Sequence, residues 1–372
     1  MFAAASRGSA LRCNRLKFSG PGMMREPFPS IAKSARTFLR FMFEQKKSLS
    51  PLLILTHDFP DPDALASGFA FYHIARNILN INARLAYGGI IGRTENKEMV
   101  RILKIPVHQF HPQDFSRFPH VALVDTQPEF ENNPFPAARR ADIVIDQHPP
   151  LNYSSARLSI VDDTCGATSV ILAQALLSLK EEIPKRVATA LAYGIITDTL
   201  NLYRAKRSEI IGIYKAVLPF CDMRALARMQ NPTRSRRFFV TLKRGIQNAT
   251  IRQRLIVSHL GDVENPDLVS QIADFLLSFR GTRWALCTGR YRDRLYISLR
   301  AANPQALAAN VLRDIVNDPK EAGGHETIAG GSMYIGRGVQ KLKWEETEKS
   351  LVQKLASRLH LSASTEPTYP FR

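Results

Sequence analysis

One histidine and three aspartates lie within seven consecutive positions, in the segment HDFPDPD that begins at His57. The segment follows an apolar run at 52–55 and precedes apolar residues at helical spacing, at 63–79. Carboxylates and an imidazole gathered in this way can hold a divalent cation or exchange protons with a substrate. This segment is therefore the first candidate for a functional site.

Further acids end apolar segments elsewhere: Asp125 ends HVALVD, Asp146 ends ADIVID, and Asp198 follows VATALAYGIIT. A single acid at such a position is most often a helix cap or a turn former. Acids after the three strand-like runs at 51–57, 120–125 and 141–146 are better explained by side chains that converge at the carboxyl ends of parallel strands, where open α/β sheets bind ligands. Several carboxylates in one cavity repel each other unless cations hold them together. The pattern therefore predicts bound metal, and the oxygen-rich ligands favour Mn²⁺ or Mg²⁺.

Composition limits the remaining classes of protein. The 372 residues are 45% hydrophobic and 23% charged, which is ordinary for a globular chain with room for two cores. The four cysteines are far apart, so neither a zinc knuckle nor a disulfide framework is indicated. No apolar run approaches the roughly 20 residues of a membrane-spanning helix. We therefore expect a soluble cytoplasmic protein without membrane partners.

The formal net charge of +18 favours polyanionic partners, although unspecific solvation explains it equally well. The first 25 residues contain no acid and are rich in Ala, Ser and Arg, as mitochondrial presequences are. A mis-assigned start, with Met23 or Met24 as the true one, or a disordered tail is the preferred interpretation, and mitochondrial targeting is the alternative. Residues 1–28 are therefore left out of the predicted fold.

Alternating strand and helix patterns predict an α/β fold. Apolar runs at 51–57, 120–125 and 141–146 read as strands covered on both faces, and helical spacing appears at 30–47 and 63–79. Towards the C-terminus, a helix at 267–279 and two strands flanking a turn at Asp293 predict a smaller mixed sheet. An Arg-rich stretch with an Asn-Pro pair, at 227–246, reads as a linker and the start of a bridging helix.

The motifs resemble those of the DHH phosphoesterase family. His57-x-x-x-Asp61-x-Asp63, Val124-Asp125-Thr126, Asp146-Gln147-His148 and Gly194-Ile-Ile-Thr-Asp198-Thr agree with its four motifs in order and spacing. SLRA from Ser298 and GGHETIAGG at 323–331 resemble the DHH-associated C-terminal domain. The resemblance implies a DHH domain at 29–225, a linker at 226–245, a DHH-associated domain at 246–345, a C-terminal helix and tail at 346–372, and an active site in the interdomain cleft.

The resemblance also implies two Mn²⁺ ions, with Mg²⁺ as an alternative. It assigns the first ion to His57, Asp61 and Asp125, and the second to Asp63, Asp198 and the bridging Asp125. The family's middle histidine of the third motif, ordinarily a ligand of the second ion, is Gln147 here. A neutral amide oxygen is a weaker ligand than imidazole, so either Gln147 binds the second ion loosely or His148 replaces it.

On the substrate side, the resemblance assigns phosphate contacts to His148, unless it becomes a metal ligand, and charge neutralisation to Arg300 and His325. Close backbone approach to the substrate is assigned to Gly323, Gly324 and Gly330, where a Cβ would interfere. The mechanism implied is hydrolysis by a water that two ions activate. Both predicted domains would contribute to it.

The implied function is hydrolysis of short oligonucleotides, such as nano-RNA, or of adenosine bisphosphate. Hydrolysis of cyclic or linear di-AMP is a close alternative within the same family. A different class, a non-catalytic nucleotide-binding regulator, is suggested by Gln147. A short oligonucleotide or dinucleotide is the expected partner, and the resemblance allows a homodimer without specifying one.

Overall fold

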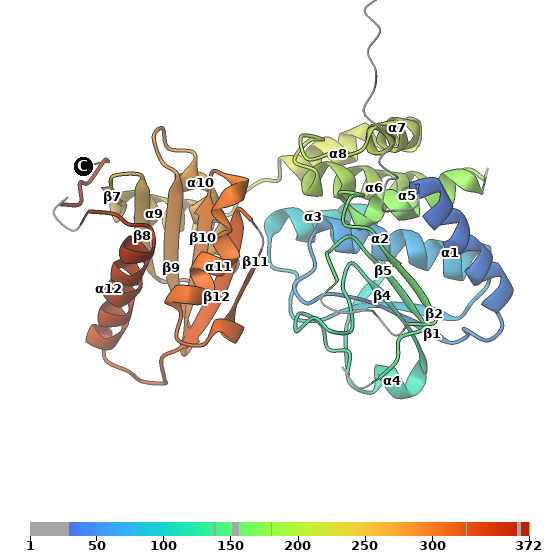
Figure 1. Cartoon of the computed structure of the whole chain (residues 1–372), viewed down its shortest axis with the longest axis horizontal. Helices are drawn as coiled ribbons and strands as arrows, with labels where there is room; N and C mark the ends of the chain where they lie inside the picture. Colours follow the sequence, from blue (N-terminus) through green and yellow to red (C-terminus); the bar gives the residue numbers. More distant parts are fainter. Residues whose placement is uncertain are drawn as a thin grey trace, which may run out of the picture.

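The computed structural model describes residues 30–136, 139–150, 156–179, 181–324, 326–362 and 366–371. The segment 1–28, predicted to be a disordered or mis-assigned N-terminus, lies outside the described residues. The rest forms two sheets with their helices, which lie side by side in Figure 1. Within the described residues, no helix combines the length and the apolar character needed to cross a bilayer.

The first sheet is parallel throughout, with strand order β3-β2-β1-β4-β5-β6. Its central strand β1 is buried at every position, as its apolar run predicts. Because all six strands run the same way, their carboxyl ends meet at one edge of the sheet. The strands are β1 (Leu52–Thr56), β2 (Ala83–Tyr87), β3 (Val107–Gln109), β4 (His120–Val124), β5 (Ile143–Asp146) and β6 (Leu158–Val161).

Helices cover both faces of this sheet. In Figure 1, α1, α2, α5 and α6 lie above the strands and the short α4 lies below. A second, smaller core that includes Phe135, with the partly buried Phe115 packed against it, fills the lower side. The helices are α1 (Ile31–Gln45), α2 (Pro62–His73) with a π-helical continuation (Ile74–Ile78), α3 (Thr94–Leu103), α4 (Asp114–Arg117), α5 (Thr168–Ser178), α6 (Lys185–Asp198), α7 (Ser208–Val217) with a 3₁₀ turn (Leu218–Phe220), and α8 (Met223–Gln230).

The second sheet is mixed, with order β11-β12-β10-β9-β8-β7, and only the β8–β9 pair is parallel. Separate hydrophobic cores lie on its two faces. The strands are β7 (Thr250–Arg252), β8 (Leu255–Asp262), β9 (Trp284–Tyr291), β10 (Arg294–Ala301), β11 (Ala322–Gly324) and β12 (Ile328–Tyr334). The helices are α9 (Arg236–Gln247), α10 (Asp267–Leu277), α11 (Ala308–Ile315), α12 (Lys341–Arg358), and two 3₁₀ turns (Pro304–Ala306 and Pro319–Glu321). The predicted α/β fold with a parallel and a smaller mixed sheet is confirmed.

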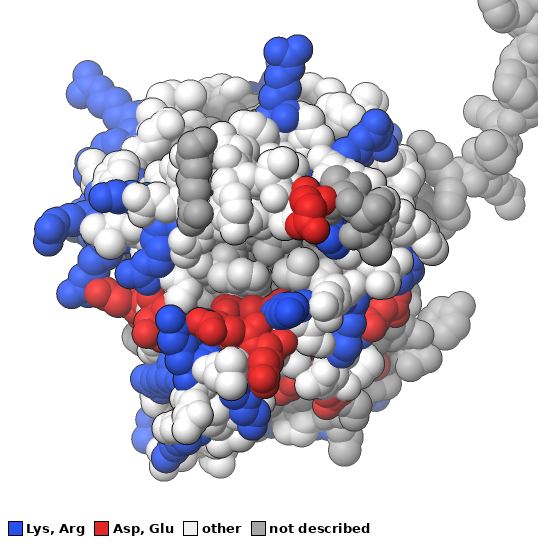
Figure 2. Space-filling view, turned by 90° about the vertical axis from the view of Figure 1, so that its left-hand side faces the viewer, with Lys and Arg blue, Asp and Glu red and all other residues white. Residues whose placement is uncertain are grey.

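Between α8 and α9 the chain crosses from one sheet to the other at residues 231–235. Arg234 in this connection donates hydrogen bonds to Glu95 of α3 and Gln271 of α10, one residue from each side. Figure 2 faces the end of the molecule that carries the second sheet, and there Asp and Glu side chains interrupt the Lys and Arg side chains. The excess of positive charge therefore forms no uniform patch on that face.

The packing of α2, α5 and α6 depends on Gly194. A Cβ at this position would lie 2.9 Å from the Ala66 Cβ, 2.9 Å from the Ser169 Oγ and 3.2 Å from the Asp63 Cα. These atoms belong to backbones or short side chains that cannot move aside alone, so the helices would have to separate.

We expect Gly194→Ala to lower the free energy of unfolding by about 1–3 kcal/mol through overpacking. Gly212 on α7 is the matched control, because a Cβ there meets nothing within 4 Å. Gly212→Ala should be neutral or stabilise by up to about 1 kcal/mol through helix propensity. Urea unfolding followed by circular dichroism measures both, and equal effects would contradict the packing argument.

Candidate metal centre

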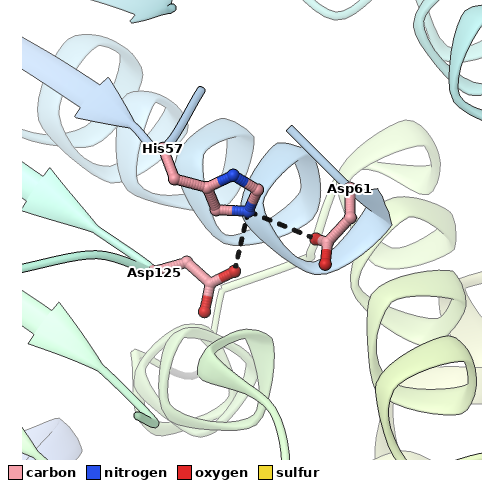
Figure 3. A group of neighbouring side chains, drawn as sticks. All are labelled: His57, Asp61 and Asp125. Carbon is pink, nitrogen blue, oxygen red and sulfur yellow. Dashed lines mark ion pairs between the residues drawn. The ribbon is translucent and has the colours of Figure 1, made fainter. Parts of the chain in front are cut away.

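The candidate site lies at the carboxyl ends of three adjacent parallel strands. His57 follows β1, Asp125 follows β4 and Asp146 ends β5. Figure 3 shows the His57 ring between the carboxylates of Asp61 and Asp125. His57 Nε2 lies 3.9 Å from Asp61 Oδ1 and 3.6 Å from Asp125 Oδ2. The side chains predicted to hold the first ion are thus brought together.

The backbone fixes which nitrogen of His57 faces the acids. Its Nδ1 lies 2.8 Å from the carbonyl oxygen of Asp58, which can only accept a hydrogen bond. Nδ1 therefore carries the proton of the neutral ring, and Nε2 presents its lone pair to Asp61 and Asp125. This is the arrangement of a metal-binding histidine whose second nitrogen is held by a carbonyl.

Asp61 and Asp63 take different positions at the start of α2. Asp61 is the N-cap, and its Oδ1 accepts hydrogen bonds from the backbone N–H groups of Asp63 and Ala64, each at 3.0 Å. Asp63 lies inside the first turn, is fully buried, and points to the N-terminus of α5. Asp61 therefore lies towards His57, whereas Asp63 is hydrogen-bonded to the neighbouring helix α5.

Asp125 has the least compensated carboxylate of the site. Its backbone is left-handed, with φ of 60°, a conformation that aspartate tolerates better than most residues. Asp125 Oδ1 accepts a hydrogen bond from the Thr168 hydroxyl at 2.7 Å, but Oδ2 is buried without a donor among the described residues. A buried acceptor without a donor costs free energy that a cation beside His57 and Asp61 would recover. The first set of residues therefore fits a divalent cation.

The third motif forms a hydrogen-bonded group next to this set. His148 Nδ1 lies 2.8 Å from Asp146 Oδ1, and the Gln127 amide donates to Asp146 Oδ2 at 2.6 Å. His148 Nδ1 also lies 3.9 Å from Asp125 Oδ1. Asp125, Asp146 and His148 are close enough together to share an ion. His148 is thus positioned beside the metal site.

Gln147 contacts two of the acids predicted for the second ion. Its Nε2 donates to Asp63 Oδ2 at 3.3 Å and makes a short hydrogen bond to Asp198 Oδ2 at the end of α6. Asp63, Gln147 and Asp198 are therefore brought together, as predicted. The amide presents N–H groups to the carboxylates, which is the opposite of the oxygen ligand that the sequence suggested.

Burial and mutual repulsion shift the titration of the acids. Burial, followed by the neighbouring carboxylates, raises the pKa of Asp125 to about 6 and that of Asp198 to about 8. The same causes place the pKa of Asp63 well above its usual value. Burial also opposes ionisation of Asp61, but His57 outweighs it and lowers the pKa of Asp61 below its usual range.

The pKa values of the two histidines are raised, which favours the charged form of each ring. Burial would lower the pKa of His57, but the hydrogen bond and charge of Asp61, with the charge of Asp125, raise it to about 9. Burial is likewise outweighed at His148, where Asp146 and Asp125 raise the pKa to about 10. Without a cation, protons on these rings therefore compensate the acids.

The predicted substrate residues lie on the second sheet. Gly323 and Gly324 are exposed on β11, and Gly330 is exposed on the neighbouring β12. Arg300 is only 3% exposed; its guanidinium donates to Asp274 and to the carbonyl oxygens of Leu299 and Ala329. His325 lies outside the described residues. The contacts of Arg300 brace β10 against β12, and its predicted contact with substrate stays a prediction.

Three residues that the sequence did not single out complete the site. Thr168 and Ser169 begin α5 and hydrogen-bond to Asp125 and Asp63, and Gln127 holds Asp146. Small hydroxyl residues after Gly166 are a signal for a helix start. Nothing in that signal indicates that the start of the helix would donate hydrogen bonds to Asp125 and Asp63, about 40 and 100 residues earlier in the chain.

Comparisons with known proteins agree with the motifs and with the fold. Residues 51–195 match the model described as the DHH family, N-terminal domain. An uncharacterised protein of Methanocaldococcus jannaschii is 32% identical over 295 residues, 79% of this chain and 59% of that protein. A probable manganese-dependent inorganic pyrophosphatase of Streptococcus equi subsp. zooepidemicus is 27% identical over 168 residues, 41% of this chain and 50% of that protein. The chain thus spans 50 to 59% of the length of these curated relatives.

Among solved structures, an exopolyphosphatase-related protein from Bacteroides fragilis has a TM-score of 0.69 at 16% identity, covering 88% of this chain and 98% of that one. At this identity the likeness shows the fold alone. Fold and site define an α/β protein with a histidine and carboxylate centre at the ends of parallel strands. Residues 51–195 match the N-terminal domain of the DHH family, which confirms the resemblance in the motifs.

The raised pKa values predict how the stability of the cation-free protein varies with pH. His57, His148 and Asp198 bind their protons more tightly when folded, so the folded state holds more protons than the unfolded state between pH 6 and 9. Stability should therefore fall as the pH rises through this range. Added Mn²⁺ should reverse the fall, with an affinity that rises by up to about tenfold per pH unit for each proton displaced. Thermal scans with EDTA or Mn²⁺ measure both, and a cation-free melting temperature that rises from pH 6 to 9 would contradict this account.

Asp125→Asn should separate stability from cation binding. The variant keeps an oxygen for Thr168 and removes the uncompensated charge, so at pH 8 the cation-free protein should gain on the order of 1–3 kcal/mol. The rise in melting temperature on adding Mn²⁺ should disappear. Asp142→Asn is the control, because Asp142 pairs with Arg157 away from this group. It should lose stability and keep the Mn²⁺ effect; loss of the effect in both variants would count against the assignment.

Proposed function

We propose that this protein is a metal-dependent phosphoesterase that hydrolyses short oligonucleotides or small phosphorylated nucleotides, with Mn²⁺ as its metal. The observation that carries the proposal is the buried Asp125 Oδ2, which has no donor among the described residues and lies 3.6 Å from His57 Nε2. Similarity to manganese-dependent inorganic pyrophosphatases supports both the metal and phosphoryl chemistry.

His57, Asp61 and Asp125 would hold the ion. When bound, the ion supplies a Lewis acid for a phosphoryl oxygen and lowers the pKa of a water ligand towards neutrality. His57 keeps its lone pair directed at the ion because Asp58 fixes its tautomer. Asp61 is oriented by the two N–H groups it caps, so the ligands need little rearrangement.

His148 is our candidate for binding the substrate phosphate. Asp146 and Asp125 keep its pKa near 10, so at neutral pH the ring is an imidazolium beside the metal position. A charged donor placed there would neutralise the charge that develops on the phosphoryl oxygens during hydrolysis. Asp146 fixes the ring through Nδ1, and Gln127 fixes Asp146 in turn.

The glycine-rich hairpin of β11 and β12 would approach the nucleotide. β11 is the edge strand of its sheet, and in Figure 1 it faces the first sheet. Gly324 has φ of 139°, and a Cβ there would lie 2.1 Å from the Ile328 carbonyl oxygen, so the turn requires glycine. Arg204, six residues after Asp198, donates to the Thr327 hydroxyl at 3.0 Å. This bond joins the hairpin to the loop that follows the metal site.

Inorganic phosphates are the main competing substrates, since two relatives bear the names of a pyrophosphatase and an exopolyphosphatase-related protein. The match to the pyrophosphatase covers only 41% of this chain. The family resemblance associates inorganic pyrophosphatases with a Ser-Arg-Lys-Lys run, which does not occur in this sequence, and nucleotide-hydrolysing members with a Gly-Gly-His segment, which does. A nucleotide substrate is therefore preferred.

Purified protein with Mn²⁺ should hydrolyse diadenylate, adenosine bisphosphate or cyclic di-AMP faster than pyrophosphate. His57→Ala should reduce the rate by about 10²-fold or more, because it removes the nitrogen ligand of the ion. His108→Ala is the control, since His108 is exposed on β3 and should be replaceable. Hydrolysis of pyrophosphate alone would overturn the nucleotide assignment, and nucleotide binding without turnover would favour the non-catalytic alternative.

A further inference from the structure

We infer that Gln147 takes the place of the second cation: its carboxamide N–H groups hold Asp63 and Asp198 together, so the centre binds a single divalent ion. The inference rests on the proposed function for the ion at His57, Asp61 and Asp125. It departs from the two-ion centre that the motif resemblance implies.

Hydrogen bonds already occupy the carboxylate of Asp63. A carboxylate has about four lone-pair positions, two on each oxygen. Oδ1 of Asp63 accepts from the backbone N–H of Ser169 at 2.9 Å and from its hydroxyl. Oδ2 accepts from the backbone N–H of Thr168 at 2.6 Å and from Gln147 Nε2 at 3.3 Å. Four donors therefore fill the four positions, and a cation could bind only by displacing one of them.

Three of these four donors belong to the start of α5. The first N–H groups of a helix have no partner within the helix, and the helix dipole favours an anion beside them. The Asp63 side chain is fully buried, so losing these bonds would leave buried N–H groups without acceptors. Asp63 is thus held as the counter-ion of α5, and this role competes with metal binding.

The Gln147 amide supplies the fourth donor and continues to Asp198. Its Nε2 has two N–H groups, and the structure directs Nε2 at both Asp63 Oδ2 and Asp198 Oδ2. The opposite orientation would place the amide oxygen against the oxygens of two carboxyl groups, which is repulsive unless a proton or a cation lies between them. The amide N–H groups reduce the repulsion between Asp63 and Asp198, as a cation would, and no ion has to be desolvated.

The first ion position differs in each of these respects. Asp125 Oδ2 has no donor among the described residues, and the neutral ring of His57, whose Nδ1 is held by the Asp58 carbonyl oxygen, directs its Nε2 lone pair to the same position. Asp61 offers an Oδ2 whose neighbour Oδ1 takes both capping bonds. The position at His57, Asp61 and Asp125 thus has acceptor atoms without donors, whereas the acceptor atoms of Asp63 at the other position already have donors.

A single ion changes how the site would treat a phosphate. In a two-ion centre the second ion neutralises charge on the phosphoryl group. Here the group on that side of Asp125 is the imidazole of His148, whose Nδ1 is held by Asp146 Oδ1 at 2.8 Å and lies 3.9 Å from Asp125 Oδ1. His148 would therefore be a catalytic residue that binds a phosphoryl oxygen, and it would not be recruited as a replacement metal ligand.

The number of Mn²⁺ ions bound per chain tests the inference directly. We expect equilibrium titration of the full-length protein to give about one ion for the wild type and about two for Gln147→His, because imidazole restores a nitrogen ligand. Ions that share Asp125 would be magnetically coupled, so the variant should show an exchange-coupled spectrum in electron paramagnetic resonance that the wild type lacks. Gln174→His, on the outside of α5, is the matched control and should bind as the wild type does.

Each result separates this inference from the proposed function. Two coupled ions in the wild type would overturn the single-ion centre and leave the proposed hydrolase intact. A single ion without hydrolysis of any phosphate ester would support the inference and overturn the function. Failure to bind any ion would overturn both. If Gln147→His does not fold by circular dichroism, the wild-type titration and spectrum still decide.

Discussion

The structure depends on a constraint of charge: four carboxyl groups converge, those of the fully buried Asp63 and Asp125 and of the partly buried Asp61 and Asp198, and they cannot all remain anionic without counter-groups. Three of them each meet a different counter-group. The N-terminus of α5 serves Asp63, His57 faces Asp61, and the Gln147 amide serves Asp198. Asp125 Oδ2 keeps no donor among the described residues, and this identifies where a cation is needed.

The backbone brings these side chains together although they are far apart in the sequence. Parallel strands bring His57, Asp125 and Asp146 to one edge of the sheet, although they are up to 89 residues apart in the chain. The helices add the rest, because α2 begins with Asp61 and Asp63, and α6 ends with Asp198. Gly194 lets α6 come within contact of both α2 and α5. Helix packing and the electrostatics of the site therefore depend on the same few positions.

The sequence predicted the two kinds of sheet and the acids and histidines of the first sheet's edge because both leave a local pattern. Apolar patterns identified β1, β4 and β5 with the helices α1 and α2, and acids at strand ends identified the edge where these strands meet. Partners across the fold leave no such pattern. Arg300 was assigned to the substrate, which stays a prediction; its contact with Asp274 of α10 was not foreseen, because it follows from strand alternation, which turns Leu299 to one core and Arg300 to α10. Likewise Gln147 was recognised as a departure, but the direction of its amide follows from Asp63 and Asp198, which come from distant helices.

A histidine, an amide and a helix N-terminus differ in whether they can exchange protons while they hold a carboxyl group. An amide holds two carboxyl groups at fixed geometry and does not itself titrate, whereas an imidazole gains and loses a proton. The acceptors that a cation would meet therefore lie on the side of the cavity that includes His57 and Asp125, with His148 beside them. Asp63, Gln147 and the start of α5 form the side whose hydrogen bonds are already made. A phosphate bound at the cation would lie beside Asp125, at the edge of the sheet, and the link from Arg204 to Thr327 keeps the glycine-rich hairpin near the loop that leaves this site.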